Sequence, residues 1–130
     1  MKNYLEIVNG LVNFAHINMA NRKIVWYKEY FTDFLSTLDD GTKRKVLQTL
    51  RLIQSIDVIP SQYFKHIENT KGLYEIRVEY SGNIYRIFCC FDKGQIVILF
   101  NGFKKKSQKT PQQEIEKAKV LMKEYFDLKD

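Results

Sequence analysis

The chain has 130 residues, of which 45% are hydrophobic, 14% aromatic and 28% charged, and its formal net charge is +6. This length suits a single domain with one core, and the apolar content excludes a disordered chain. The positive charge favours encounter with a polyanion such as nucleic acid, or with an acidic protein partner, and does not choose between them.

Cysteine usage and hydropathy narrow the class of protein further. The two cysteines are adjacent, Cys89 and Cys90, so on a strand they point to opposite faces and a disulfide between them is not expected. They fit no zinc-ligand spacing, and we expect no metal, no other cofactor and a reducing, cytoplasmic location. No apolar run approaches the roughly 20 residues that span a bilayer, so no membrane role is expected.

The first 20 residues show the weakest pattern of secondary structure. We expect residues 1–20 to be an N-terminal extension of uncertain role and residues 21–130 to form a single domain. Apolar residues in the extension would suit a short helix, although Gly10 weakens the pattern. Met19 opens a stretch that resembles an ordinary protein start, so it is a candidate native initiation site.

A strand and two helices are predicted next. KIVWY, residues 23–27, has the β-branched and aromatic content of a strand. Two helical stripes follow, separated by a turn at residues 39–41 that offers a capping carboxylate, and we expect them to pack as a hairpin. Their apolar positions are Phe31, Phe34, Leu35 and Leu38 in the first helix and Val46, Leu47, Leu50 and Ile53 in the second.

The middle of the chain reads as an antiparallel meander. Pro60 ends the helical region, and strand-like segments follow at residues 63–68, 73–80, 84–91 and 95–101. The turn at residues 92–94 allows either orientation of the last strand, so Asn101 cannot be assigned to a face.

A final helix is signalled by its start. Thr110 as N-cap, Pro111 at the first helical position and Gln113 at the third predict a capping box. The predicted fold class is therefore α+β: an N-terminal strand and a helical hairpin packed on a mainly antiparallel sheet of four to five strands, with a C-terminal helix. The apolar face of that helix consists of Ile115, Ala118, Met122 and Tyr125.

Arg77 and Arg86 are the most informative polar residues of the meander. Alternation along residues 73–80 points Arg77 away from the core, and Arg86 interrupts a strand that is otherwise apolar on both faces. A type II′ turn at Gly82-Asn83 would pair Glu79 with Arg86 and place both arginines on one face. The simpler interpretation is an ordinary cross-strand ion pair between Glu79 and Arg86, and the alternative is a functional anion site.

Three motifs carry a family resemblance. LYEIR, YRIF and GFKKKSQKTP, followed by the final helix, occur in this order within residues 24–126. The chain thereby resembles the RelE/ParE superfamily toxins of type II toxin-antitoxin systems, and in particular the phage-associated HigB-like branch. The resemblance implies a compact RelE-like domain, ribosome-dependent cleavage of mRNA without a metal, and inhibition by a HigA-like helix-turn-helix antitoxin.

The family pattern assigns the catalytic positions to Arg77, Arg86, Lys105 and Lys106. Metal-free cleavage uses the 2′-hydroxyl of RNA as nucleophile, so the protein must supply a base, an acid and stabilisation of the phosphoryl charge. The arginines suit charge stabilisation because their planar forks bind phosphate oxygens. Either of the two lysines is the candidate base, provided that neighbouring cations lower its pKa.

The remaining polar residues receive lesser roles. Lys104 and Lys109 are expected to bind RNA phosphates, and the simpler interpretation of the whole lysine run is a solvated basic loop. Many relatives carry a histidine where Asn101 stands, which excludes histidine acid-base chemistry at that position. His66 is kept as a reserve proton donor.

Two other functions stay open. One is a non-catalytic inhibitor such as a gyrase-binding ParE-like toxin, and the other is a basic module that binds nucleic acid or an antitoxin without cleaving RNA. Codon preference, the identity of the antitoxin, the oligomeric state and the division of acid and base roles do not follow from the sequence.

Overall fold

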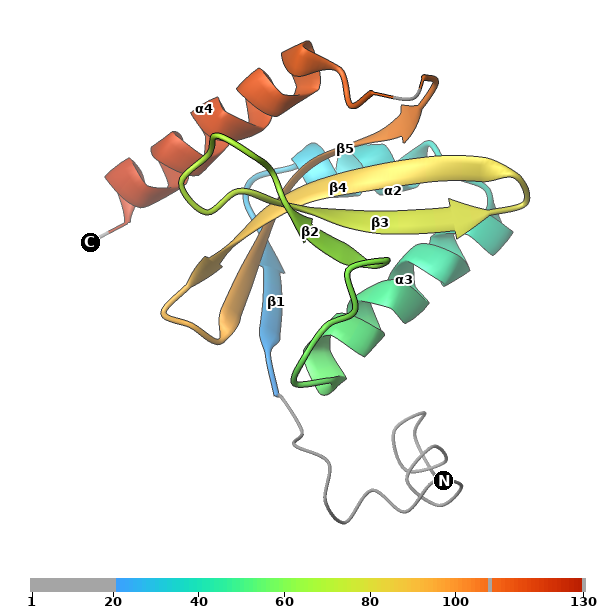
Figure 1. Ribbon diagram of the computed structural model, residues 1–130, viewed down its shortest axis with the longest axis horizontal. Helices are drawn as coiled ribbons and strands as arrows, with labels where there is room; N and C mark the ends of the chain where they lie inside the picture. Colours follow the sequence, from blue (N-terminus) through green and yellow to red (C-terminus); the bar gives the residue numbers. More distant parts are fainter. Residues whose placement is uncertain (1–20, 108, 130) are drawn as a thin grey trace.

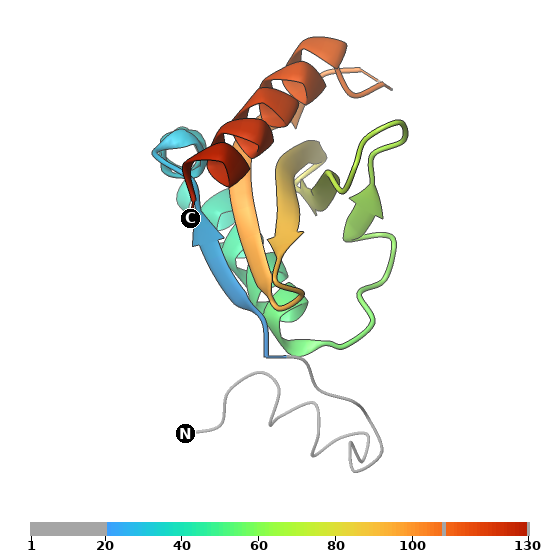
Figure 2. The ribbon, with the colours of Figure 1, turned by 90° about the vertical axis from the view of Figure 1, so that its left-hand side faces the viewer.

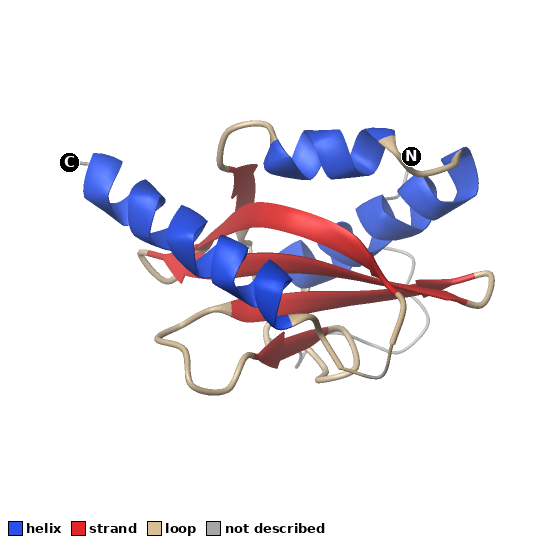
Figure 3. Cartoon of the chain, turned by 90° about the horizontal axis from the view of Figure 1, so that it is seen from above, coloured by secondary structure: helices blue, strands red, loops and turns tan. Residues whose placement is uncertain are grey.

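A mixed sheet with helices on both faces forms the core of the protein (Figures 1 and 3). The structure, a computed structural model, describes residues 21–107 and 109–129, so the expectations for residues 1–20 and Met19 lie outside the described residues. The sheet has five strands in the order β1-β5-β4-β3-β2. The elements are β1 (Lys23–Trp26), α2 (Tyr30–Ser36), α3 (Asp40–Ser55), β2 (Phe64–His66), β3 (Tyr74–Tyr80), β4 (Asn83–Asp92), β5 (Ile96–Lys105) and α4 (Gln112–Leu128).

The predicted α+β fold is confirmed. β1 pairs parallel to β5, and the other neighbouring strands pair antiparallel. The parallel pair arises because α2, α3 and the meander intervene between β1 and β5, whereas the meander strands are joined by short turns. Within the described residues, no helix is both long enough and apolar enough to cross a membrane.

α2 and α3 cover one face of the sheet. Phe31 and Phe34 of α2 and the buried side of α3 pack on apolar side chains of β3, β4 and β5. Asp39 caps α3 as predicted, since its carboxylate accepts a hydrogen bond from the Thr42 N–H at 2.7 Å. Leu47, predicted to be apolar core, is 49% exposed because it lies one residue beside the buried stripe that contains Val46.

α4 covers part of the opposite face. Ala118 and Leu121 are buried against side chains of β4 and β5, and the predicted positions Ile115, Met122 and Tyr125 pack around them. The predicted capping box is wrong. The helix begins one residue later, after Pro111 as N-cap, and the Thr110 hydroxyl instead donates to the carboxylate of Glu75 at 3.4 Å.

The register of the β3–β4 hairpin also differs from the prediction. Tyr80 lies opposite Asn83, so Ser81 and Gly82 form the turn. Both turn residues have positive φ, 53° and 80°, as a type I′ turn requires, and glycine suits the second position. The strands therefore slide by two residues relative to the predicted pairing, which leaves every side chain on its predicted face.

A bulge between β4 and β5 settles the orientation of Asn101. Ile87 lies opposite Gly102 and Cys89 opposite Leu99, so β5 holds one extra residue between these pairs. The Asn101 side chain is buried, and its Nδ2 donates to the backbone oxygen and to Oε2 of Glu114 in α4, at 3.3 and 3.2 Å. Asn101 therefore fastens α4 to β5.

Candidate active site

Part of the α4 side of the sheet carries a cluster of charged side chains. In Figure 2, α4 runs along the β5 side and β2 forms the far edge of the sheet. Arg77 lies opposite Arg86, and Arg86 lies opposite Phe103, so these residues form one row across β3, β4 and β5. Glu75 follows two residues from Arg77 on the same face, with Lys65 of β2 opposite it.

Glu75 holds the two arginines together. Its Oε2 lies 3.6 Å from Nε of Arg86, and its Oε1 lies 3.7 Å from Nε of Arg77. Glu75 and Arg86 are only 6% and 3% exposed, so this charge pair lies in the interior of the protein. Alternation along β3 predicts that Glu75 and Arg77 share one face. The predicted hairpin register paired Arg86 with Glu79, so it did not indicate that Glu75 contacts Arg86.

The guanidinium of Arg86 is incompletely satisfied. One terminal nitrogen donates to the backbone oxygen of Tyr85 at 3.1 Å, while Nε has no hydrogen-bond partner among the described residues. Burial lowers the pKa of Arg86, and the charge of Arg77 lowers it further, while Glu75 acts in the opposite direction. Because a buried donor without a partner is costly, Arg86 is suited to an incoming anion.

Lys105 lies at the end of β5, opposite Ile84, on the same face as Arg86. Its side chain is partly buried. Burial lowers the pKa of Lys105, the charges of Arg86, Arg77 and Lys65 lower it further, and Glu75 partly offsets this effect. A lysine in these surroundings loses its proton more easily than an exposed lysine, which is the property that a general base needs.

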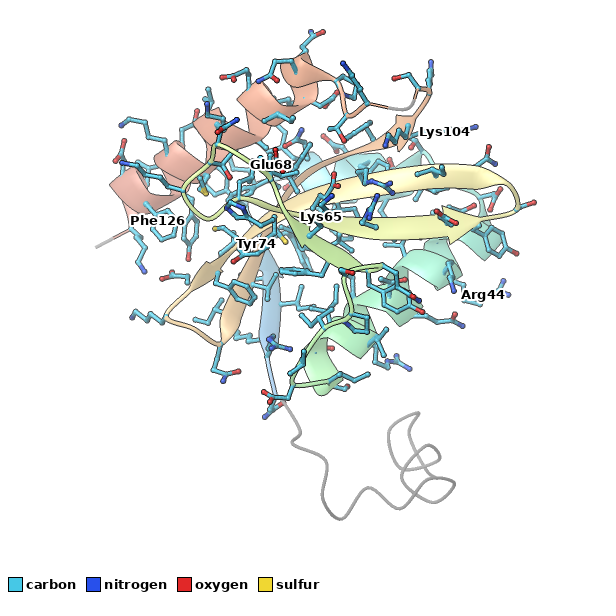
Figure 4. The ribbon with its side chains drawn as sticks, in the orientation of Figure 1. Arg44, Lys65, Glu68, Tyr74, Lys104 and Phe126 are labelled. Carbon is cyan, nitrogen blue, oxygen red and sulfur yellow. The ribbon has the colours of Figure 1, made fainter. Side chains whose placement is uncertain are left out.

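The other predicted lysines lie elsewhere. Lys104 points to the opposite face, opposite Tyr85, where it lines a cavity of about 750 Å³. Lys106 and Lys109 are exposed in the loop beyond β5. Figure 4 shows Lys104 at the far end of β5, well separated from Lys65 over β2. The fold thus brings together Arg77, Arg86 and Lys105, and it does not bring Lys104 to them.

His66 does not face this cluster. It lies opposite Tyr74, one residue along β2 from Lys65, and so projects to the other side of the sheet. One of its ring nitrogens is 3.1 Å from the backbone oxygen of Thr70. His66 is therefore not placed to act as a proton donor in this cluster. In the described part of the chain, no group of three His, Cys, Asp or Glu side chains is arranged to hold a metal ion.

Comparisons with known proteins address both family and fold. The family model described as "Phage derived protein Gp49-like (DUF891)" matches residues 33–123. No curated protein sequence matches the chain. A chain in the crystal structure of the archaeal RelE-RelB complex from Pyrococcus horikoshii OT3 matches with a TM-score of 0.50 and 15% sequence identity, covering 68% of this chain and 99% of that chain.

The two matches bear on the fold and on the family of the chain. The structural likeness, at its low identity, shows that the fold is RelE-like. The family model shows the family of the chain, while its role as a toxin and the HigB branch stay predictions. The region matched by the family model includes Arg77, Arg86 and Lys105 and extends over more than half of the sequence. The chain therefore belongs to the phage-derived Gp49-like family.

Proposed function

We propose that residues 21–130 form the toxin of a type II toxin-antitoxin pair, which cleaves mRNA on the ribosome by attack of the 2′-hydroxyl on the adjacent phosphate. The observation that carries this proposal is the buried guanidinium of Arg86, whose Nε makes no hydrogen bond within the described residues, next to Arg77 and Lys105. Such a cluster offers an anion site and a candidate base on one face of the sheet. The Gp49-like family and the RelE-like fold support the toxin class.

In this mechanism the arginines stabilise the negative charge that grows on the phosphoryl oxygens. Two guanidinium groups stay protonated at neutral pH and offer several donors in fixed planes. Glu75 is a positioning residue, because it contacts both arginines and holds Arg86 in the sheet. The two arginines outweigh the single negative charge of Glu75, so the site keeps a net positive charge. That charge stabilises the dianionic transition state of the phosphate more than its monoanionic ground state.

Lys105 is the proposed general base. In its neutral form it would take the proton of the 2′-hydroxyl. Burial, together with the adjacent cations, lowers the pKa of Lys105 and so raises the neutral fraction at a given pH. Lys106 is the alternative base, and Lys104 and Lys109 would attract RNA phosphates from the surrounding loop and edge. The leaving 5′-oxygen takes up a proton from solvent and becomes the 5′-hydroxyl of the downstream product.

The proposed partners are the ribosome with its mRNA, in the cytoplasm, and a cognate antitoxin. The structure from Pyrococcus horikoshii OT3 is a RelE-RelB complex, which supports an antitoxin partner for this chain too. A HigA-like helix-turn-helix antitoxin is the specific form that we propose. Co-expression with the product of a neighbouring gene, followed by tests of growth rescue and co-purification, would check this partner.

The test of the function is induction in bacteria followed by mapping of new 5′ ends on a translated and an untranslated copy of one transcript. The comparison variant is Arg77→Ala/Arg86→Ala, and the matched control is Arg44→Ala on the exposed side of α3. We expect cuts in the translated copy only, lost in the double variant and retained in the control. Growth arrest without cuts would indicate a gyrase-type inhibitor, and neither effect would indicate a binding module.

A further inference from the structure

Two adjoining cavities form a groove between α3 and the edge of the sheet. β2 pairs with β3 only as far as Phe64 opposite Ile76, so this edge of β3 is free of β2 from Arg77 onward. Tyr63 continues past β2, and its backbone oxygen accepts a hydrogen bond from the Arg77 N–H at 2.9 Å. The cavities have volumes of about 410 and 300 Å³, and both are lined by Lys45, Thr49 and Tyr63.

The groove and the candidate active site meet at the edge of β3. Arg77 is one of the residues that line the first cavity, and its side chain contacts Glu75 in the charged cluster on the α4 side of the sheet. From there the groove passes Tyr63 and Lys45 and reaches Arg51 in the second cavity. An extended ligand that passes around the free edge of β3 could therefore contact both the cluster on the α4 side of the sheet and the groove beside α3.

The lining of the groove fits single-stranded nucleic acid. Lys45, Arg51 and Arg77 supply positive charge along its length, and Glu79 is the acidic residue among the lining side chains. From Gly41 to Ser55, α3 carries no acidic residue. Gln48 and Gln62 add amides that can bond to base edges. A half-buried tyrosine between cations is the combination that single-strand binding sites use, with stacking for bases and charge for phosphates.

We propose that this groove holds the stretch of single-stranded RNA that adjoins the scissile phosphate, with one base stacked on Tyr63 and the following phosphates near Lys45 and Arg51. The proposal rests on the proposed function, because Arg77 joins the groove to the cleavage site. An acidic peptide would also meet the charge of the groove, but it would make no use of the flat face of Tyr63. The aromatic lining therefore favours RNA.

The test measures binding, which needs no cleavage. Fluorescently labelled oligouridylates with 2′-O-methyl groups, three and eight nucleotides long, lack the nucleophilic hydroxyl and stay intact. We expect the wild-type protein to bind the longer oligomer at least tenfold more tightly at low salt. Tyr63→Ala should weaken binding of the longer oligomer about tenfold and hardly change binding of the shorter one. The expected size follows from the stacking of one base on an aromatic ring, which changes affinity by about a factor of ten.

Matched variants separate stacking, charge and misfolding. Tyr63→Phe keeps the ring, so it should bind like the wild type, and Arg51→Gln should reduce the slope of log affinity against log salt by about 0.7. Arg44→Gln changes an exposed α3 residue outside the lining of both cavities and should have a clearly smaller effect. Thermal unfolding of each variant checks that the fold is intact.

Three results would overturn the groove. The first is equal affinity for the two oligomer lengths, and the second is an equal loss in Tyr63→Ala and Tyr63→Phe. The third is binding of oligoglutamate that competes with the oligouridylate and is as sensitive to Tyr63→Ala, which would assign the groove to an acidic protein partner. Length-dependent binding without any RNA cuts in cells would instead contradict the proposed function and leave the groove standing.

Discussion

Glu75 and Arg86 form a buried ion pair across β3 and β4, with Oε2 and Nε 3.6 Å apart and exposed fractions of 6% and 3%. The pair explains how the interior of the sheet tolerates a guanidinium. Nε of Arg86 makes no hydrogen bond within the described residues, because its distance to Glu75 is too long for one. Glu75 thus supplies the counter-ion of the buried guanidinium, and Arg86 keeps a donor without a hydrogen bond beside Arg77.

Removing one partner of this pair should be costly. Glu75→Leu leaves Arg86 as a buried charge without its counter-ion, and we expect a loss of about 3 kcal/mol in the free energy of unfolding. The double variant Glu75→Leu/Arg86→Met should recover part of that loss, because it removes both charges. Urea unfolding of both single variants and the double variant measures the coupling. Additive losses would show that the two side chains do not interact, and Glu79→Leu at the exposed end of β3 is the control.

The pKa of Lys105 should respond to its neighbours in a defined direction. Burial is the main cause of the lowered pKa of Lys105, and the charge of Lys65 lowers that pKa a little further. Lys65→Gln should therefore raise the pKa slightly and reduce the neutral fraction at a given pH. If Lys105 is the base, the cleavage rate rises with pH until that pKa is reached, and the profile of Lys65→Gln moves to higher pH. NMR titration of the labelled lysine gives the pKa independently of activity. Lys104→Gln, on the opposite face, should leave the profile unchanged, and a shift there equal to that of Lys65→Gln would refute the assignment.

Asp92 should make the docking of α4 sensitive to acid. Its carboxylate accepts hydrogen bonds from the Tyr125 hydroxyl at 2.7 Å and from Nζ of Lys129 at 2.8 and 2.6 Å. Lys129 and Tyr125 lower the pKa of Asp92. Because the folded pKa lies below the unfolded one, the stabilisation is complete above about pH 4 and is lost as pH falls through the folded value.

Thermal unfolding at two pH values tests this link. Asp92→Asn should lower the melting temperature at pH 7 and make a smaller difference at pH 2, because the wild-type carboxylate takes up its proton as the pH falls through the folded pKa. Asp127→Asn, on an exposed part of α4, is the control. An equal decrease at both pH values would mean that Asp92 acts through its shape and not through its charge.

Gly102 should not tolerate a side chain. A Cβ at this position would lie 2.6 Å from Cδ2 and 2.8 Å from Cγ of Phe34, a buried residue of α2. We expect Gly102→Ala to destabilise the protein by about 1 to 3 kcal/mol. Adding Phe34→Leu should relieve the overlap, so the double variant should lose less than the sum of the single losses. Strict additivity in chemical denaturation would argue against the close contact.

The helices and strands were easier to predict from the sequence than the register in which the strands pair. Period-two alternation identified the strands and assigned Arg77 and Arg86 to one face, because that assignment survives a slide of two residues. The register itself depended on whether Gly82 takes the first or second turn position, which composition does not decide. The role of Glu75 was lost with the register.

The contacts of Thr110 and Asn101 were beyond prediction for a different reason. Local capping rules predict that Thr110 caps the final helix. In the fold its hydroxyl instead donates a hydrogen bond to the carboxylate of Glu75, which is distant in sequence. Asn101 owes its burial to a bulge in β5 and to the position of Glu114. Both contacts arise from tertiary packing, which overrides local propensity.

Cleavage of a ribosome-bound mRNA by purified protein tests the central claim most directly. The mRNA would carry either ribose or a single 2′-deoxyribose at the nucleotide 5′ to the mapped cut. We predict products with a 5′-hydroxyl end from the ribose substrate, no cut at the deoxy position, and no cleavage by Arg77→Ala/Arg86→Ala. Cleavage that persists at the deoxy nucleotide or in the double variant would contradict 2′-hydroxyl attack at the site built from Arg77, Arg86 and Lys105.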